Sequence, residues 1–321
     1  MTMIDRPSPE GPSTDSRQPR ERPPSVRRLL PRVLGLEAAD ALVLAALVAF
    51  TVLAVVFHRR VAGWQLLAAK NLVAAVVFLA ATTAARCLNQ GGARFLVRMG
   101  AVSLAYAYLF GAVDSLQLIL HGRWLDGTVL ALEERLFGVQ PTLWMQRFVS
   151  PWLTEWMMFA YVVYLPLYPL VCAAIYARRG ERAAEEVFFS LGLVNVLCDV
   201  GFILFPVAGP LAFIGGRFTV PLEGWVFTSL GELVRAKLHF VGGSLPSPHC
   251  AAATVLWGMA WRHRRWLFWL LAPIVVTLYV STVYGRYHYV SDAVTGIVLA
   301  LVVLAVAPRL LRAWERLQSP R

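Results

Sequence analysis

Tyr284-Gly285-Arg286-Tyr287-His288-Tyr289-Val290-Ser291-Asp292 is a short polar stretch between two long apolar runs, residues 266–285 and 291–308. A second polar stretch, Gly243-Ser244-Leu245-Pro246-Ser247-Pro248-His249, leads into the apolar run 248–264. About 20 apolar residues cross a bilayer as one helix. If the runs between the two stretches cross a membrane down and back, both histidines reach the same face. The two stretches therefore predict one polar site at a membrane surface.

The composition of the 321-residue chain is that of a membrane protein. Hydrophobic residues make up 58% of it and charged residues 15%, and the mean hydropathy is +0.60. A soluble domain of this length is less apolar. The net charge of +11 is compatible with nucleic-acid binding. However, the basic residues cluster at the ends of the apolar runs, where they fix topology and contact anionic headgroups. We therefore expect an all-α, polytopic helix bundle that binds no nucleic acid.

Eight apolar runs have a length near that of a membrane span. They are residues 38–57, 64–85, 97–120, 153–177, 186–208, 248–264, 266–285 and 291–308. The sixth run is short, and arginines at its end can snorkel to the interface and extend it.

The same patterns divide the chain into five regions. The stretch 123–150 mixes Glu133, Glu134 and Arg135 with leucines, which predicts an amphipathic helix that lies on the membrane surface. We predict a disordered Pro/Arg-rich tail, N-terminal transmembrane helices, this interfacial segment, a catalytic transmembrane core and a second tail. The boundaries are 1–35, 36–122, 123–150, 151–310 and 311–321.

The distribution of arginine predicts the orientation of the bundle. Most arginines lie in the N-terminal tail, at every second connection between spans and in the C-terminal tail. The positive-inside rule then places both termini in the cytoplasm and both histidine stretches outside. Arg59 and Arg60, in the first outer loop, oppose this assignment. We expect an integral protein of the cell (inner) membrane with an extracytoplasmic site.

The first histidine stretch has the pattern of a helix start. Ser247 is a preferred N-cap residue, and Pro248 is preferred at the first helical position. The free N–H groups of a helix N-terminus bind anions. His249, in the first turn, could donate a proton to a departing oxygen. A plain helix cap with an interfacial histidine would give the same pattern.

The second stretch places His288 four residues before Asp292. If the last helix starts near His288, this spacing stacks the two side chains on one helical face. Asp292 could then hold the Nδ1–H of the imidazole and leave Nε2 free as a nucleophile. Arg286 offers forked donors that match phosphate oxygens. The alternative is an ion pair that anchors a helix end. The coincidence of both stretches on one face favours a site that acts on phosphate.

At these residues the chain resembles the type 2 phosphatidic acid phosphatase superfamily. Pro246-Ser247-Pro248-His249 and the later His288 with Asp292 match its two histidine motifs. The stretch 281–292 is similar to the branch that contains inositol phosphorylceramide synthases, and 205–210 also resembles that branch. The resemblance implies a six-helix core and metal-independent chemistry through a phosphohistidine, without a cofactor.

The resemblance also implies a role for each motif residue. His288 would be the nucleophile, Asp292 its orienting partner and His249 the acid, while Ser247 and Arg286 would hold the phosphate. The substrate would be a membrane lipid, and the acceptor would be water or a small alcohol such as inositol.

The chain departs from the family pattern at the phosphate-binding positions. Ser281-Thr282 stands where a Ser-Arg pair is usual, and Leu211 stands where the branch often has arginine after Gly-Pro. Arg217, Arg235 or Lys237 could supply the missing charge.

Two other functions use the same residues. His249, His288 and Asp292 could bind a metal ion that activates water, or polar residues could line the path of a transporter. Asp199, within the fifth apolar run, either supports the site from below or makes a hydrogen bond between helices.

Overall fold

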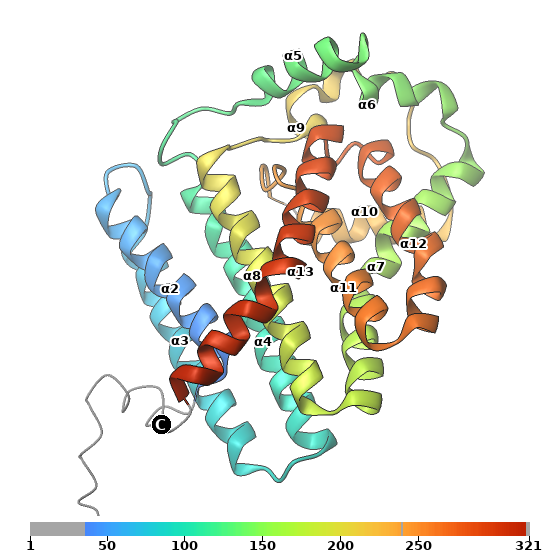
Figure 1. Ribbon diagram of the computed structural model, residues 1–321. Coiled ribbons are helices and arrows are strands. Elements are labelled where there is room, and N and C mark those ends of the chain that lie inside the picture. The colour runs from blue at the N-terminus through green and yellow to red at the C-terminus, as the bar shows by residue number, and fades with distance from the viewer. Residues whose placement is uncertain (1–35, 239, 319–321) are drawn as a thin grey trace, which may run out of the picture.

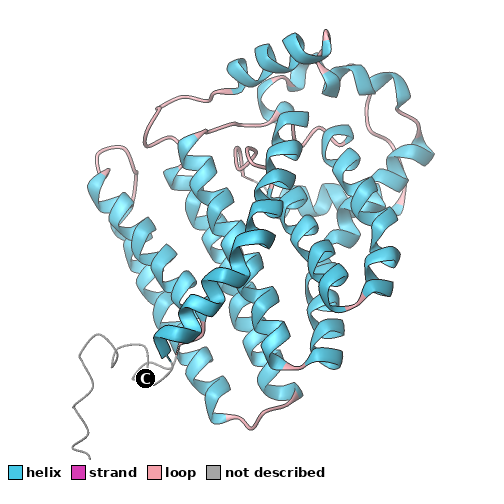
Figure 2. Cartoon of the chain, viewed as in Figure 1, coloured by secondary structure: helices cyan, strands magenta, loops and turns pink. Residues whose placement is uncertain are grey.

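Seven helices are long and apolar enough to cross a membrane in the computed structural model, which describes residues 36–238 and 240–318. These described residues contain no strand, so the protein is an all-α, polytopic membrane protein (Figures 1 and 2). The seven are α2 (Ala38–Val56), α3 (Trp64–Cys87), α4 (Gly92–Ala112), α7 (Pro151–Arg179), α8 (Glu181–Leu204), α12 (Arg265–Tyr284) and α13 (Val290–Gln318). A 3-10 turn, η1 (Val113–Leu116), extends α4.

The remaining predicted span, the sixth in chain order, is the helix α11 (Pro248–His263), which has only 16 residues. It packs against α7, α8, α12 and α13 and is buried along most of its length. The run Ala251-Ala252-Ala253 is fully buried, and such small side chains let neighbouring helices approach closely. Because other helices surround α11, it does not need the length of a lipid-facing span. The prediction of about eight spans thus holds as seven long helices and one short central helix.

The described chain begins and ends on the same side of the bundle, as the sequence predicts. The side chains of Trp314 and Gln318 donate hydrogen bonds to the carbonyl of Leu36, at 3.1 and 2.6 Å. The first and last described residues therefore meet at one end of the bundle. We call it the arginine end, because the arginine-rich connections between the spans lie there. The opposite end, with the connections 240–247 and 285–289, is the histidine end. The predicted tail 1–35 and residues 319–321 lie outside the described residues.

The predicted interfacial segment does not cross the bundle, but it is not a single helix. It forms α5 (Asp126–Phe137), α6 (Pro141–Trp144) and the 3-10 turn η2 (Met145–Phe148), above the histidine end (Figure 1). Gly138, with φ of 71°, ends α5 in a left-handed conformation that glycine adopts at low cost.

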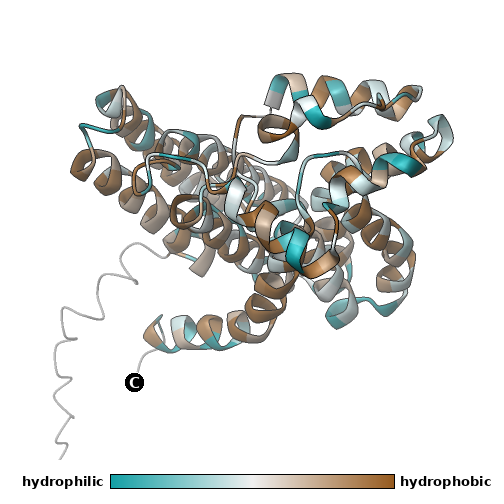
Figure 3. Ribbon diagram, turned by 90° about the horizontal axis from the view of Figure 1, so that it is seen from above, coloured by the Kyte–Doolittle hydropathy of each residue, from teal (hydrophilic) through white to brown (hydrophobic). Residues whose placement is uncertain are grey.

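Two acidic side chains of α5 face the protein rather than solvent. Asp126 and Glu133 are fully buried against the protein, whereas Leu136 and Phe137 are more than half exposed. Glu133 therefore docks α5 on the bundle, whereas its neighbours Glu134 and Arg135 are exposed. Seen from above, the ribbon of the spanning helices is mainly brown, the colour of apolar residues (Figure 3).

The long connection after α8 folds over the histidine end. The fifth predicted span ends at Leu204 rather than residue 208, because Pro206 lacks the N–H that a helix requires. The connection contains α9 (Pro210–Phe213), the 3-10 turn η3 (Gly215–Arg217) and α10 (Val226–Leu238). Glu155 of α7 accepts hydrogen bonds from the N–H groups of Trp225, Phe227 and Thr228 at the start of α10. This carboxylate anchors α10 to α7.

Candidate active site

The two histidine stretches meet at the histidine end, as the topology predicts. The connection before α11 lies against the start of α13, where the N–H of Ser247 donates to the carbonyl of Asp292 at 2.9 Å. His249 comes from the first turn of α11, and His288 comes from the connection between α12 and α13. Residues separated by 39 positions in the chain are thereby in direct contact.

The titratable groups of the site are arranged in series. Nδ1 of His249 lies 3.2 Å from Nε2 of His288. Nδ1 of His288 lies 3.1 Å from the carbonyl oxygen of Ser244 and 3.6 Å from Oδ2 of Asp292. The Asp292 and His288 side chains are 0% and 4% exposed. Because the Ser244 carbonyl can only accept, Nδ1 of His288 carries the hydrogen and Nε2 keeps its lone pair.

Ser244 links the carboxylate to the imidazole, and the sequence did not single it out. Its hydroxyl donates to Oδ2 of Asp292 at 2.6 Å and lies 3.2 Å from Nδ1 of His288. The other carboxylate oxygen of Asp292 has no hydrogen-bond partner among the described residues. Only the position of Ser244 within the first polar stretch could have indicated its role, because its partners lie more than 40 residues away in the chain.

His288 and Asp292 do not meet in the way that their spacing suggests. The helix α13 begins at Val290, so His288 precedes it and the two do not share a helical face. Oδ2 of Asp292 accepts the N–H of Tyr289 at 2.9 Å. This bond folds the chain back at the start of α13 and brings His288 beside the carboxylate.

Burial keeps His288 neutral. Removal from water disfavours the imidazolium and lowers the pKa of His288 to about 4, although the hydrogen bond to the Ser244 carbonyl opposes this shift. At neutral pH the ring therefore presents an unprotonated nitrogen to His249. A neutral imidazole is the form that can act as a nucleophile.

Aromatic rings fix the orientation of His249. Tyr161 stacks on His249, with ring centroids 4.9 Å apart, and Tyr164 lies 5.4 Å away. Tyr287 stacks in turn on Tyr161 at 4.5 Å. Tyr161 and Tyr164 are three residues apart on α7, so one face of that helix holds the histidine. Nothing in the sequence near either histidine indicates this contribution from α7.

Ser247 acts as the predicted helix cap. Its side chain accepts the N–H of Cys250 at 3.4 Å, and the residue is fully buried. The dipole of α11 therefore points its positive end toward the site. The predicted contact of Ser247 with phosphate stays a prediction.

Arg286 lies beside the outer loop rather than against the histidines. Its φ of 67° is unusual for a residue with a side chain. The guanidinium lies 4.4 Å from the ring centroid of Phe218 and donates to the carbonyl of Val220. It is 8% exposed and makes no ion pair within the described residues. Burial lowers its pKa. Its predicted role in phosphate binding likewise stays a prediction.

The helix α5 holds the site from outside through two buried carboxylates. Asp126 accepts hydrogen bonds from the N–H groups of Ala208 and Gly209, at 2.8 and 3.0 Å, and from the hydroxyl of Tyr289 at 3.0 Å. Glu133 accepts the N–H of Ser291 at 2.8 Å. Both carboxylates therefore contact residues that flank His288 and Asp292. Burial raises the pKa of Asp126 and of Glu133, and their hydrogen bonds oppose the shift.

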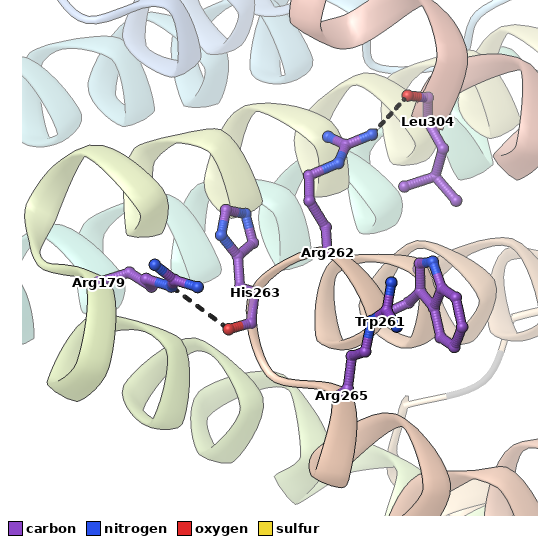
Figure 4. A pocket seen from close by; sticks show the side chains of 7 residues that line it. Arg179, Trp261, Arg262, His263, Arg265 and Leu304 are labelled. Atoms are coloured by element: carbon purple, nitrogen blue, oxygen red, sulfur yellow. Dashed lines mark hydrogen bonds between the residues drawn. The ribbon is translucent and has the colours of Figure 1, made fainter.

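A second polar pocket lies at the arginine end (Figure 4). Arg179, Arg262, His263 and Arg265 line a volume of about 650 Å³. Arg179 donates to the carbonyl of His263 at 3.4 Å. Glu186 accepts from Arg262 and lies 3.1 Å from Nε2 of His263. This pocket lacks a carboxylate–imidazole–imidazole series, so the histidine end is the candidate active site.

The site residues do not converge on a common metal position. Asp292 lies near Nδ1 of His288, whereas His249 faces Nε2 on the opposite side of the ring. The described part of the chain holds no group of three His, Cys, Asp or Glu side chains with the geometry for a metal ion.

A comparison with known protein families gives one match. A family model described as the PAP2 superfamily matches residues 128–306, a range that contains most of α5, both histidine stretches and most of α13. No curated protein and no solved structure matches the chain.

Proposed function

The chain belongs to the PAP2 superfamily of phosphatases and phosphotransferases, and we propose that it acts on the phosphate ester or phosphodiester of a membrane lipid through a phosphohistidine intermediate. The observation that carries the proposal is the series of Asp292, Ser244, His288 and His249. Nε2 of His288 is a neutral nitrogen that can attack phosphorus. Asp292 and Ser244, on the Nδ1 side of the ring, stabilise positive charge, and His249, on the Nε2 side, is the acid.

In the first step Nε2 of His288 attacks phosphorus. The bond between phosphorus and the ester oxygen breaks, and His249 donates a proton to that oxygen. The phosphate has to enter between the two rings, so it replaces their 3.2 Å contact. The Nδ1–H of His288 stays bonded to the Ser244 carbonyl, and Asp292 balances the positive charge of the phosphorylated ring through the hydroxyl of Ser244.

In the second step the acceptor takes the phosphoryl-linked group. His249, now neutral, removes a proton from water or from an alcohol as its oxygen attacks phosphorus. The phosphorus–nitrogen bond breaks and His288 returns to its starting form. Each proton that His249 donates in the first step is recovered in the second.

The phosphate oxygens require donors in the same place. We assign this role to the N-terminus of α11, which Ser247 caps, and to Arg286. The absence of an acidic partner of Arg286 within the described residues supports the assignment, because a buried guanidinium favours an anionic ligand.

The acceptor decides whether the protein is a phosphatase or a transferase. The similarity of 281–292 to inositol phosphorylceramide synthases favours transfer to an alcohol over transfer to water. The test is an assay that follows released phosphate and newly formed phosphate esters in one reaction, with and without an added alcohol such as inositol or a ceramide. A phosphorylated product that depends on the added alcohol supports transfer. Phosphate release alone supports hydrolysis, and neither product would contradict the proposal.

The two alternative functions have less support. Asp292 and His249 lie on opposite sides of the His288 ring, so the three side chains do not fit one shared metal ion. Transporters bind substrate at the midplane of the membrane, whereas this site lies at one end of the bundle. Full activity after treatment with strong chelators would count against the metal mechanism. Turnover in detergent, without a gradient, would count against transport.

We also propose that the histidine end faces away from the cytoplasm. The arginine-rich connections at the other end support this orientation. Cys87 offers a test because it is exposed at the arginine end, whereas the other three cysteines are buried. A membrane-impermeant maleimide should label Cys87 in opened membranes and not in intact cells. Labelling in intact cells would reverse the orientation.

A further inference from the structure

A largely apolar cavity runs from the side of the bundle to His249. It has a volume of about 620 Å³ and lies between α4, α7 and α8, with the start of α11 at one end. Its lining extends along α4 from Leu96 to Phe110, a length of about 20 Å at the rise of an α-helix. Leu104 is 74% exposed and Leu165 is 44% exposed at its mouth. The cavity is therefore open to the surrounding lipid.

One wall of this cavity, the helix α4, lies outside the residues that the family model matches. It belongs to the N-terminal helices, which precede the matched residues 128–306. The other walls, α7, α8 and α11, come from the matched region.

On the α8 wall of the cavity, the polar side chains lie on the side of His249. On α8, the residues Phe188, Leu191, Asn195 and Asp199 line the cavity at helical spacing, so they share one face. Asp199 is the residue of this set that lies nearest to the end of α8 at the histidine end. The α8 wall thus changes from apolar to polar in the direction of His249.

Asp199 is the unusual member of this lining. It is 2% exposed and has no hydrogen-bond or ion-pair partner among the residues that the structure describes. Glu185 and Glu186 of the same helix both pair with arginines. A buried carboxyl group without a partner is costly, and such a group within a membrane commonly contacts a substrate.

We propose that Asp199 hydrogen-bonds a polar group in the backbone of the lipid substrate, next to the phosphate that reaches His249. The apolar tail then occupies the cavity beside α4. This inference rests on the proposed function and narrows it to one substrate class. The preferred lipids carry an ester, amide or hydroxyl next to the phosphate, as glycerolipids and sphingolipids do. Polyprenyl phosphates, which are hydrocarbon up to the phosphate, are disfavoured.

The reason for selectivity is the unpaired carboxyl group. A site with a buried polar group rejects a ligand that leaves this group unpaired far more strongly than it rejects a ligand of slightly different size. A polyprenyl phosphate would fill the cavity and leave Asp199 without a partner. A glycerolipid would fill it, and an ester carbonyl of the lipid would accept a hydrogen bond from the protonated carboxyl group of Asp199.

The experiment compares three phosphate esters with the purified full chain in detergent. The probes are dioleoyl phosphatidic acid, a polyprenyl phosphate, and the water-soluble ester p-nitrophenyl phosphate. We expect the wild type to prefer phosphatidic acid over the polyprenyl phosphate by at least tenfold in kcat/KM. Preference for the polyprenyl phosphate would overturn the inference and leave the proposed function intact. No turnover of any of the three would overturn the inference, and it would overturn the proposed function as well if phosphodiester lipids and added alcohols also gave no product.

Substitutions at Asp199 then test the residue itself. Asp199→Leu should lower the ratio of kcat/KM for phosphatidic acid to that for the polyprenyl phosphate by at least tenfold. Asp199→Asn keeps a hydrogen-bonding group and should hold this ratio within about threefold of the wild type. Thermal unfolding checks that both variants are folded. An unchanged ratio in folded Asp199→Leu, including an equal loss with all three esters, would overturn the inference.

A cavity-filling pair tests where the tail lies. A Cβ atom on Gly100 would meet no other atom within 4 Å, so Gly100→Phe fills the cavity beside α4 without a backbone clash. Ala74→Phe is the matched control, because Ala74 lines a separate apolar cavity of about 550 Å³ between α2, α3 and α4. Gly100→Phe should lower kcat/KM for phosphatidic acid at least tenfold relative to p-nitrophenyl phosphate, and Ala74→Phe should not. Equal effects of the two variants would overturn the placement of the tail.

Discussion

The two ends of this bundle both bury charged and polar side chains, but they use them differently. At the arginine end the buried arginine is compensated by carboxylates: Arg98 pairs with Asp40 at 2.5 Å and with Glu185 at 2.7 Å. At the histidine end the groups stand in series, a neutral imidazole separates a carboxylate from a second imidazole, and one oxygen of Asp292 has no partner within the described chain.

This difference indicates a structural role for the buried charges of the arginine end and a chemical role for the histidine end. Mutually paired charges satisfy each other and have no capacity left for a ligand. A series of groups with an unused lone pair and an unused oxygen can accept charge that develops on a substrate. We therefore expect substitutions at the arginine end to change stability, and substitutions at the histidine end to change rate.

The largest effect is expected at His288. His288→Gln removes the nucleophile, so turnover of a lipid phosphate should fall by about 10⁴-fold or more, while the melting temperature stays near that of the wild type. Turnover and thermal unfolding of the same sample measure the two effects. The control is His263→Gln, which changes a histidine paired with Glu186 at the arginine end. If both variants lost activity equally, the distinction between the two ends would fail.

The second effect is expected at Arg98. Arg98→Met removes the cation between the buried Asp40 and the half-buried Glu185 and leaves Asp40 with only its 3.3 Å contact to Arg86. This loss should destabilise the protein by about 3–5 kcal/mol. Thermal unfolding in detergent measures the loss. The activity per folded molecule should stay within about threefold of the wild type. A stable but inactive Arg98→Met protein would show that the arginine end takes part in the chemistry.

The third effect is smaller and lies at Ser244. Ser244→Ala removes the hydroxyl between Asp292 and His288 and keeps the backbone carbonyl that bonds Nδ1. The loss of one hydrogen bond to a charged group costs about 1.5–3 kcal/mol, which corresponds to about 10- to 100-fold in kcat. Steady-state kinetics measures it. A wild-type kcat would mean that Asp292 acts without Ser244.

The smallest effect concerns pH. Since burial lowers the pKa of His288 to about 4, the ring stays unprotonated at every pH above that value. Protonation of His288 should therefore reduce kcat/KM only as the pH falls through about 4, and by less than about twofold between pH 7 and pH 5. A pH profile of kcat/KM measures this limb. An acid limb near 6.5 that belongs to His288 would mean that the ring is solvated.

The spans and the pair of histidines could be predicted because both are signals of the linear sequence. An apolar run of about 20 residues specifies a spanning helix whatever surrounds it. The predicted runs 64–85 and 266–285 differ from α3 and α12 by no more than two residues at each end. The motif residues His249 and His288 likewise stand in polar stretches that interrupt apolar sequence.

The supporting contacts could not be predicted, because they depend on how distant segments pack. Tyr161 and Ser244 meet the histidines from other elements, and no local pattern marks them. Glu133 looks like a surface residue in its own helix and becomes buried only when α5 docks on Ser291. The hydrogen bond from Tyr289 to Asp292 delays the start of α13, which local helix propensity does not show.

A covalent intermediate on His288 is what the proposed mechanism requires. His249→Ala with radiolabelled p-nitrophenyl phosphate is the suitable system, because this leaving group needs no acid and loss of the base slows the second step. Rapid quenching should trap about one phosphate per chain, stable in alkali and labile in acid, and mass spectrometry should place it on His288. The double variant with His288→Gln should trap none. Turnover by His249→Ala without any labelled protein, or label that persists without His288, would contradict the mechanism.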